Sequence, residues 1–313
     1  MSSGEADTAT AEETEYRQAP SRLLLRGDLP EAELDSLCTE LAGGGRPAAV
    51  DLDGLGGLEP ATLAVLVSSL RRLHRRGICS LAEAIPSAEP GSCLDRRGLA
   101  ELGKAEGGLW RRCGRGRVLG WHTFASGEGA LRAAFNVASR LREDTGWSLP
   151  SFAAIAGLAF ELGENVRQHS ASPEGALALE TDASGERMRV AVADAGVGIR
   201  ASLARNPEHA DLDDDLSAIE RAVRAGETSE PGTGGGMGLY LTRTMVRGNG
   251  GRVLLRSGEA SWQESDERRR RRGLSPLRGT LIGIEARTDR PLHDDEIWEQ
   301  IDALSGPPGV GEH

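Results

Sequence analysis

Two polar side chains one helical turn apart stand out in a stretch that is otherwise rich in alanine and large apolar residues. In ELGENVRQHS, residues 161–170, Glu161 and Asn165 are four positions apart, so a helix would project both from one face. An amide oxygen is a neutral ligand that suits Mg²⁺, and a carboxylate beside it can orient or deprotonate a water molecule. On its own the pair is typical of a solvated helix surface, so its interpretation depends on the rest of the chain.

Two further segments supply groups that would complete a binding site. Asp194 ends the apolar run RMRVAVAD and begins DAGVGI, so its carboxylate would stand at a strand end, where it can accept a hydrogen bond from an exocyclic amine. The glycine-rich segment 232–238, GTGGGMG, precedes a predicted helix, LYLTRTMV. Main-chain amides at a helix N-terminus bind anions, and glycines leave room for phosphates. A turn or a flexible linker would explain either segment alone, but the three segments in this order predict a nucleotide site.

The elements that would position these residues follow from hydrophobic periodicity. The spacing predicts a helix over 149–170, with its apolar stripe toward the core. Strands are expected over 175–182 and 187–194, joined by a turn at Ser184–Gly185, and again over 251–257 and 279–286. Between them, Asp213 to Asp215 should begin a helix that ends before Gly226.

The N-terminal part alternates strand and helix patterns, which predicts βαβ units and a largely parallel or mixed sheet. Strands are expected within 21–27, 46–55 and 77–84, and helices within 30–45 and 58–77. A further amphipathic helix is expected over 128–144, and five of its residues can face inward: Leu131, Ala134, Phe135, Val137 and Leu141.

Composition narrows the function classes. The net charge of −11 argues against nucleic acid or an anionic membrane as a partner. No apolar run approaches the roughly 20 residues of a membrane helix, and the start of the chain is acidic and polar, so a cytoplasmic protein is expected. The single Gly-Lys pair is followed by alanine, which excludes a P-loop. The four cysteines form no CxxC motif, and the arginine run 268–272 is interpreted as a solvated loop.

Two resemblances to known families follow from these segments. LLLRGDLP, the AAVDLDGLGGLEPATLAVLVSSLRRLHRRG segment and CLDRRGLAELG together resemble a STAS domain, the fold of anti-anti-sigma factors. Pro60 or Ala61 stands where that family has a phosphorylated serine, and Thr62 is the nearest hydroxyl, so a scaffold domain is preferred. ELGENVRQHS, DAGVGI and GTGGGMGLYL resemble the N, G1 and G2 boxes of the GHKL ATPases, which include histidine kinases and anti-sigma serine kinases.

The GHKL resemblance implies ATP and Mg²⁺ as cofactors and assigns roles to residues of this sequence. It implies that Glu161 is the catalytic, water-orienting carboxylate, that Asn165 is the Mg²⁺ ligand and that Asp194 holds the adenine amine. Of the remaining positions, it places Gly196 and Gly198 beside the base, Gly234, Gly236, Met237, Gly238 and Leu239 at the phosphates, Thr280 at a water-mediated adenine contact, and His169 near the phosphates. The segment 200–233 would be a lid over ATP, whose arginines Arg200, Arg205, Arg221 and Arg224 could reach phosphate.

The expected architecture is therefore a two-domain α/β chain: an N-terminal STAS-like βαβ domain and a C-terminal GHKL α/β sandwich, in which helices cover one face of a mixed sheet. The expected ranges are a tail at 1–18, the STAS-like domain at 19–118, a connector helix at 119–147, the ATP-binding domain at 148–290 and a C-terminal tail at 291–313.

The combination of the two resemblances favours a bacterial regulatory protein of the partner-switching type, with a STAS or sigma-type protein as partner. It would be a serine/threonine kinase or a nucleotide-dependent binder. Two alternatives stay open: an ATPase that drives a conformational change without a phosphoacceptor, and a non-catalytic, nucleotide-gated scaffold. A homodimer is also left open. None of the six histidines lies in a dimerising helical hairpin, which argues against a sensor histidine kinase.

Overall fold

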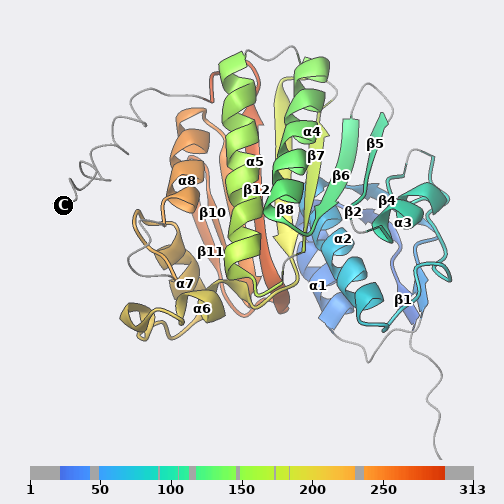
Figure 1. The fold of residues 1–313 in the computed structure, drawn as a ribbon, viewed down its shortest axis with the longest axis horizontal. Coiled ribbons are helices and arrows are strands. Elements are labelled where there is room, and N and C mark those ends of the chain that lie inside the picture. Colours follow the sequence, from blue (N-terminus) through green and yellow to red (C-terminus); the bar gives the residue numbers. More distant parts are fainter. Residues whose placement is uncertain are drawn as a thin grey trace, which may run out of the picture.

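The fold is centred on one large antiparallel sheet (Figure 1). The structure, a computed structural model, describes residues 22–42, 49–90, 92–104, 106–112, 118–145, 149–172, 174–182, 184–229 and 236–292. Within that part of the chain the sheet has eight strands in the order β11-β10-β9-β12-β8-β7-β6-β5. Their bounds are β5 Gly108–Arg112, β6 Val118–Phe124, β7 Gly175–Thr181, β8 Arg187–Asp194, β9 Arg252–Gly258, β10 Ala260–Glu264, β11 Arg268–Arg271 and β12 Leu277–Arg287.

The pairing of the strands corrects one expectation and confirms another. Every neighbouring pair in the eight-stranded sheet is antiparallel, so the prediction of a mixed sheet was wrong. Short connections account for four of these pairs, β5 with β6, β7 with β8, β9 with β10 and β10 with β11, because strands joined by short turns return beside one another in the opposite direction; the other pairs are joined by longer connections. The predicted turn at Ser184–Gly185 is confirmed: it joins β7 to β8, and Gly185 has a φ of 71°.

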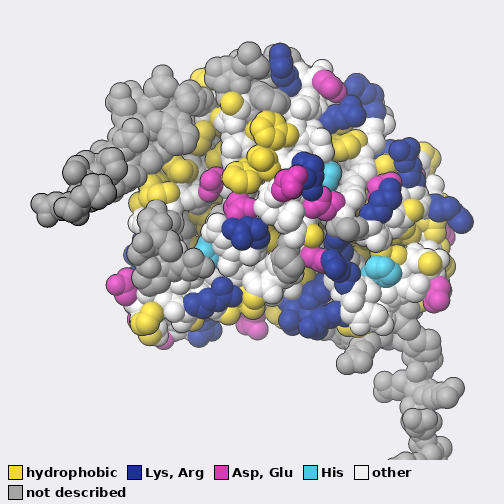
Figure 2. Space-filling model, viewed as in Figure 1, with side chains coloured by type: hydrophobic (Ala, Val, Ile, Leu, Met, Phe, Trp, Pro, Cys, Tyr) yellow, Lys and Arg dark blue, Asp and Glu magenta, His cyan; other side chains and the backbone are white. Residues whose placement is uncertain are grey.

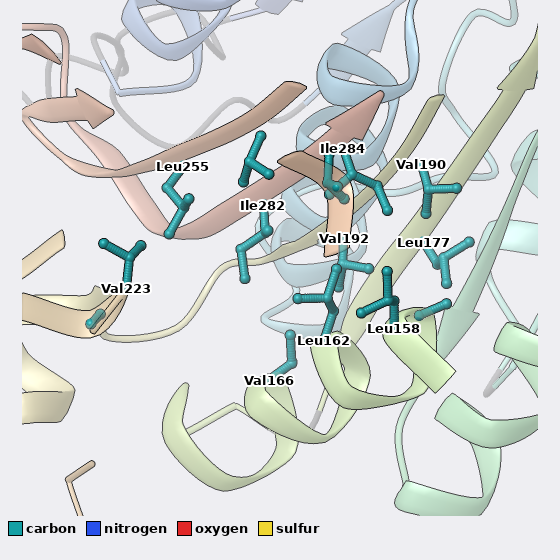
Figure 3. Packing of buried hydrophobic residues seen from close by; sticks show 14 of the residues in the cluster. Leu158, Leu162, Val166, Leu177, Val190, Val192, Val223, Leu255, Ile282 and Ile284 are labelled. Carbon is teal, nitrogen blue, oxygen red and sulfur yellow. The ribbon is translucent and has the colours of Figure 1, made fainter. Parts of the chain in front are cut away.

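Three long helices cover one face of this sheet: α4 (Gly127–Thr145), α5 (Leu149–His169) and α8 (Gly238–Gly248). Figure 1 shows α5 with α4 on one side and α8 on the other. The apolar stripe predicted for α5 is buried, and Figure 3 shows Leu158, Leu162 and Val166 turned toward the aliphatic side chains of β7, β8 and β12. This packing fixes the rotation of α5 about its axis and hence the direction in which its polar face points.

The orientation of α4 differs from the prediction. Its alanines are buried against α5 and the sheet, whereas Leu131 and Phe135 are 38% and 49% exposed. Small side chains let α4 approach α5 closely, and that contact places the larger apolar residues outside. Figure 2 shows hydrophobic side chains on the outer surface of this face. Val137 and Leu141 lie outside the residues whose burial is described.

The opposite face of the sheet is covered by the N-terminal part of the chain. Alternate residues of β7 and β8 supply alanines to this face, including Ala176, Ala178 and Ala191, and they join one buried cluster with the N-terminal leucines. Helix α2 (Pro60–Arg75) packs directly on β7 and β8. The other elements here are β1 Arg22–Leu24, β2 Gly27–Leu29, a 3₁₀ turn Glu31–Glu33, α1 Leu34–Ala42, β3 Ala49–Asp51, β4 Leu55–Leu58 and α3 Arg96–Leu102. The described helices of 148–290 thus pack into one core cluster on one face of the sheet, as expected for that range, and the N-terminal helices cover the opposite face.

The N-terminal strands form parallel pairs, β1 with β3 and β2 with β4, in line with the expected parallel or mixed pairing. The strand predicted at 77–84 is wrong, because those residues form turns and only Ile85 makes an isolated bridge, to Asp51. Thr62 is fully buried in the capping box that begins α2, where its hydroxyl donates to the Glu59 carbonyl at 2.9 Å. A hydroxyl in that position is inaccessible to a kinase, which agrees with the expected scaffold role.

Two surface features complete the description. The run 268–272 is not a loop, because Arg268–Arg271 forms the exposed edge strand β11, paired with β10. Its side chains meet acidic partners, such as Glu264 for Arg268 and Glu220 for Arg270. Charged side chains on an edge strand discourage pairing with another sheet, so the charges of β11 fit its place at the edge. Among the described helices, none combines the length and apolar character needed to cross a membrane.

Candidate functional site

A cavity of about 1130 Å³ opens between α5, α8 and the ends of β8 and β12. Five segments contribute the residues expected at the site: α5, the end of β8, the start of α6 (Gly198–Leu203), the start of α8 and the start of β12. The lining includes Glu161, Asn165, His169, Asp194, Gly198, Gly236, Met237, Gly238, Leu239 and Thr280. Two of the expected residues are not among the described lining: Gly196, which lies in the adjacent turn, and Gly234, which lies outside the described residues.

Glu161 and Asn165 lie on the face of α5 that looks into the cavity. Helix α8 begins beside them, and a methyl group added at Gly238 would come within 3.1 Å of Glu161 Oε2 and 3.4 Å of Asn165 Nδ2. Partial burial raises the pKa of Glu161, and the nearby negative charge of Glu164 raises it further. A carboxylate with a raised pKa is a stronger base, so this one is suited to accept a proton from water or a hydroxyl.

The described residues leave the side-chain amide of Asn165 incompletely satisfied. Its Nδ2 atom is buried and has no hydrogen-bond partner among the described residues. A 180° rotation of the amide group about the Cβ–Cγ bond would direct its oxygen into the same space. A buried amide that faces a cavity without a protein partner fits a group that a ligand or a hydrated cation completes.

Asp194 ends β8 at the opposite side of the cavity and is only 3% exposed. Its Oδ1 atom accepts a hydrogen bond of 2.7 Å from the Gly196 amide. Burial raises the pKa of Asp194 to about 7, although hydrogen bonds from the Gly196 and Thr280 amides oppose that effect. A carboxyl group whose ionisation is made unfavourable by burial is more typical of a binding group than of a structural one.

Neighbouring backbone segments approach Asp194 and the turn that follows it closely, because glycines there have no side chain. Gly279, with a φ of 90°, lies so close that a side chain there would meet the Asp194 carbonyl. Gly196 lies against the Ser170 carbonyl, which accepts a hydrogen bond of 2.8 Å from Val197. Gly196 therefore shapes the turn that holds Asp194 and does not itself line the cavity.

Ser257 on β9 is a positioning residue that the sequence analysis missed. Its hydroxyl donates to the Gly279 carbonyl at 2.9 Å and accepts from the Ile199 amide at 2.9 Å. These two bonds join the turn after β8 to the start of β12. The sequence offers no signal for this, because a serine in a buried strand has no motif and its partners are distant in the chain.

The glycine-rich segment is described only from Gly236 onward. Gly236 has a φ of 87°, and its carbonyl accepts a hydrogen bond of 3.2 Å from Gly226, at the end of the preceding helical segment. Gly238 begins α8, whose first amides have no partner within the helix and lie at the cavity. The start of α8 is therefore able to bind an anion beside Glu161 and Asn165.

The segment that should cover the cavity is partly packed into the core. It contains α6 (Gly198–Leu203), a 3₁₀ turn (Pro207–His209) and α7 (Asp215–Ala222), which begins at Asp214 as its N-cap, as the acidic run predicted. Residues 230–235 lie outside the described part. His169 lines the cavity, and its Nδ1 atom is hydrogen-bonded to Ser229 Oγ at 2.8 Å, which ties α5 to this segment.

None of the four arginines proposed to reach phosphate is among the described lining residues. Arg200 donates to the Leu212 carbonyl at 3.2 Å, and Arg221 pairs with Asp211 at 3.3 Å. Arg167 on α5 does line the cavity, and it is held by Glu164 at 2.8 Å. The sequence motif contained Arg167 but gave no reason to single it out.

Comparison with known proteins finds no family model that matches this chain, and no curated protein matches it. The geometry and chemistry of the cavity are therefore what bear on function.

Proposed function

We propose that the cavity binds ATP with Mg²⁺, and that the chain is a bacterial regulatory protein of the partner-switching type. The observation that carries the proposal is the convergence of a buried strand-end carboxylate, a carboxylate–amide pair and a glycine-flanked helix N-terminus around one cavity. These groups suit the three chemically different parts of a nucleotide: the base, the hydrated metal ion and the phosphates.

The two ends of the cavity suit opposite ends of the ligand. In its ionised form Asp194 accepts hydrogen bonds only, so it would receive one from the exocyclic amine of adenine. The N-terminal amides of α8 would bind the phosphates on the other side. Thr280 lies beside Asp194, which it contacts through its main-chain amide, and would face the base.

The residues present fit a magnesium ion that arrives with the phosphates. In the described part of the chain no group of three or more metal-binding side chains occurs, so an all-protein cage is not available there. Mg²⁺ commonly keeps several waters and binds one or two protein oxygens together with phosphates. Asn165 would provide that protein oxygen, and the bound ion would neutralise phosphate charge during transfer.

Glu161 would accept a proton from the water or hydroxyl that attacks the phosphate. It lies one helical turn from Asn165, and its raised pKa brings it closer to the range in which a carboxylate accepts a proton efficiently. The acceptor is either water or a hydroxyl of a partner protein. Thr62 is a poor acceptor because its hydroxyl is buried and hydrogen-bonded, so an acceptor on another chain, such as a STAS-type protein, is favoured.

The test measures ATP binding and turnover by the wild type, Glu161→Ala, Asn165→Ala and the control Glu143→Gln, with radiolabelled ATP and candidate STAS proteins. Asn165→Ala should weaken Mg²⁺-dependent binding by at least ~10-fold, equivalent to about 1.4 kcal/mol. Glu161→Ala should retain binding but lose about 10²- to 10⁴-fold in turnover, the usual contribution of a general base. Glu143 is an exposed carboxylate of α4 that is not in the described lining, so its substitution should change both quantities little.

The labelled product separates the alternatives. Label on a partner protein identifies a kinase, and free phosphate alone identifies an ATPase that drives a conformational change. Tight binding with neither product identifies a nucleotide-gated scaffold. Absence of ATP binding by the wild type at millimolar concentration would contradict the proposal in all its forms.

A further inference from the structure

The outer face of α4 exposes two large apolar side chains, one helical turn apart. Alanines fill the buried face of this helix, which lies in the layer of helices in front of the sheet (Figure 1). Leu131 and Phe135 are 38% and 49% exposed, and among the exposed large hydrophobic residues of the described chain only these two share a helix. Apolar residues that are exposed singly are common, whereas adjacent ones form a patch of the kind that marks an interaction surface.

This patch is the middle of a longer exposed stripe whose two ends carry opposite charges. Exposed residues follow one another along α4 at intervals of three, four, four and three positions, so they share one helical face: Glu128, Leu131, Phe135, Ser139 and Arg142. Phe135 is at the centre, with a carboxylate seven positions before it and a guanidinium seven positions after it. Seven helical residues span about 10 Å, so the stripe is about 20 Å long.

The symmetry of this spacing makes the stripe complementary to itself. If two copies of α4 pack antiparallel about a two-fold axis at Phe135, each residue faces the one at the same distance on the other side of Phe135. Glu128 of one copy then faces Arg142 of the second copy at both ends of the contact, and Leu131 faces the small Ser139. A two-fold interface requires this property, because the same surface of each copy meets itself.

The charges select the antiparallel arrangement of the two helices. In a parallel pair Glu128 would face Glu128 of the second copy, and Arg142 would face Arg142, so like charges would repel at both ends. Arg132, which flanks the stripe, is paired within the chain with Glu106 at 2.6 Å. Arg132 also contacts Glu128, but that side chain remains 81% exposed and can meet a second cation.

We propose that α4 is a homodimerisation surface, in which the stripe from Glu128 to Arg142 packs antiparallel on the same stripe of a second copy, with the two Phe135 rings in contact at the two-fold axis. Stacked aromatic rings stabilise a contact beyond the area they bury. A single helix pair is at the small end of protein interfaces, so association in the micromolar range is expected. None of the stripe residues is in the described lining of the cavity, so the proposal is independent of the proposed function.

Sedimentation equilibrium of the full chain, without nucleotide, measures the dissociation constant of the dimer. Phe135→Glu should raise this constant at least ~10-fold, because it replaces the central ring with a charge that meets its own copy. Glu128→Arg and Arg142→Glu should each raise it at least ~3-fold, because each substitution places like charges at both ends of the contact. The double variant with both changes should return to within ~3-fold of the wild type, because opposite charges then face each other again.

Arg140→Glu is the matched control, because Arg140 is an exposed arginine of the same helix that lies off the stripe, and its substitution should leave the dissociation constant unchanged. All the substituted side chains are exposed, so the variants should keep the fold, which circular dichroism checks. A wild type that stays monomeric at ~1 mM would overturn the proposal and leave the stripe to a different partner. A dimer that Phe135→Glu does not weaken would overturn the assignment to α4, and a double variant that stays as weak as the single ones would overturn the antiparallel pairing.

Discussion

The substitution Asp194→Asn should stabilise the protein and impair its ligand binding at the same time. Burial raises the pKa of this carboxyl from 3.8 to about 7. The folded protein therefore holds the proton more tightly than the unfolded chain, and the free energy of unfolding falls as the pH rises from about 4 to 7. A difference of about three pH units, at ~1.36 kcal/mol each, corresponds to about 4 kcal/mol above pH 7.

Asparagine keeps the shape of the side chain and removes its charge, but it retains only one acceptor oxygen. Losing one hydrogen bond from the Gly196 or Thr280 amide costs about 1 kcal/mol, so the net gain above pH 7 should be about 2–3 kcal/mol. With an unfolding entropy of about 2.1 cal/mol/K per residue, this gain raises the Tm of a chain of 313 residues by about 4 °C. At pH 4 the wild-type carboxyl is protonated when folded, and the gain should vanish.

Thermal unfolding of both proteins at pH 4 and pH 8 measures this difference, and Asp211→Asn, whose side chain is 67% exposed, is the control. ATP titration should show the opposite trend, with affinity reduced about 10- to 100-fold, since a hydrogen bond to a charged group is worth about 1.5–3 kcal/mol. Wild-type affinity should fall as the pH drops below about 7. A stabilisation of equal size at both pH values would refute the assignment of a buried, costly charge.

Two further substitutions test other parts of the structure. Gly238→Val should weaken ATP binding by at least ~10-fold, about 1.4 kcal/mol, because the valine side chain would crowd Glu161 Oε2 and Asn165 Nδ2. Calorimetric titration measures the affinity. An unchanged affinity would show that the start of α8 does not contact the ligand. Arg71→Met should lower the free energy of unfolding by about 1–3 kcal/mol, because it removes the buried guanidinium that donates to the Lys104 carbonyl and to the Thr123 hydroxyl. Urea unfolding measures this change, with Arg75→Met as the exposed control, and equal effects of the two substitutions would contradict the role of burial.

Local patterns predicted the residues of the cavity better than they predicted the sheet. Glu161 and Asn165 share a helical face whatever surrounds α5, and a carboxylate at the end of β8 stays at a strand end in either a mixed or an antiparallel sheet. These relations depend on spacing along a single element. The prediction that they converge depended on resemblance, since no local pattern specifies which strand ends lie beside which helix.

The wrong predictions concern features that depend on contacts between elements and not on spacing along a single element. A run of arginines preceded by acidic residues resembled a solvated loop, yet pairing with β10 and nearby carboxylates stabilises Arg268–Arg271 as the edge strand β11. In α4 the prediction turned Leu131 and Phe135 inward, whereas close packing of the alanines leaves both exposed. Such choices are made by tertiary contacts, which a single sequence does not contain.

The N-terminal part also reaches the cavity through the sheet. Asp35 of α1 accepts hydrogen bonds from the Arg256 side chain at 2.6 Å and from the Ser275 amide at 3.0 Å, so α1 holds the segment that leads into β12. That segment continues to the irregular pairing between Leu277 and Thr280, where Gly279 and Thr280 press against Asp194. Ser257, the residue after Arg256, holds Gly279 from the cavity side. The two sides of β9 thus connect α1 to the proposed base-binding end of the cavity, and a partner that moved α1 would act on the residues proposed to hold the nucleotide.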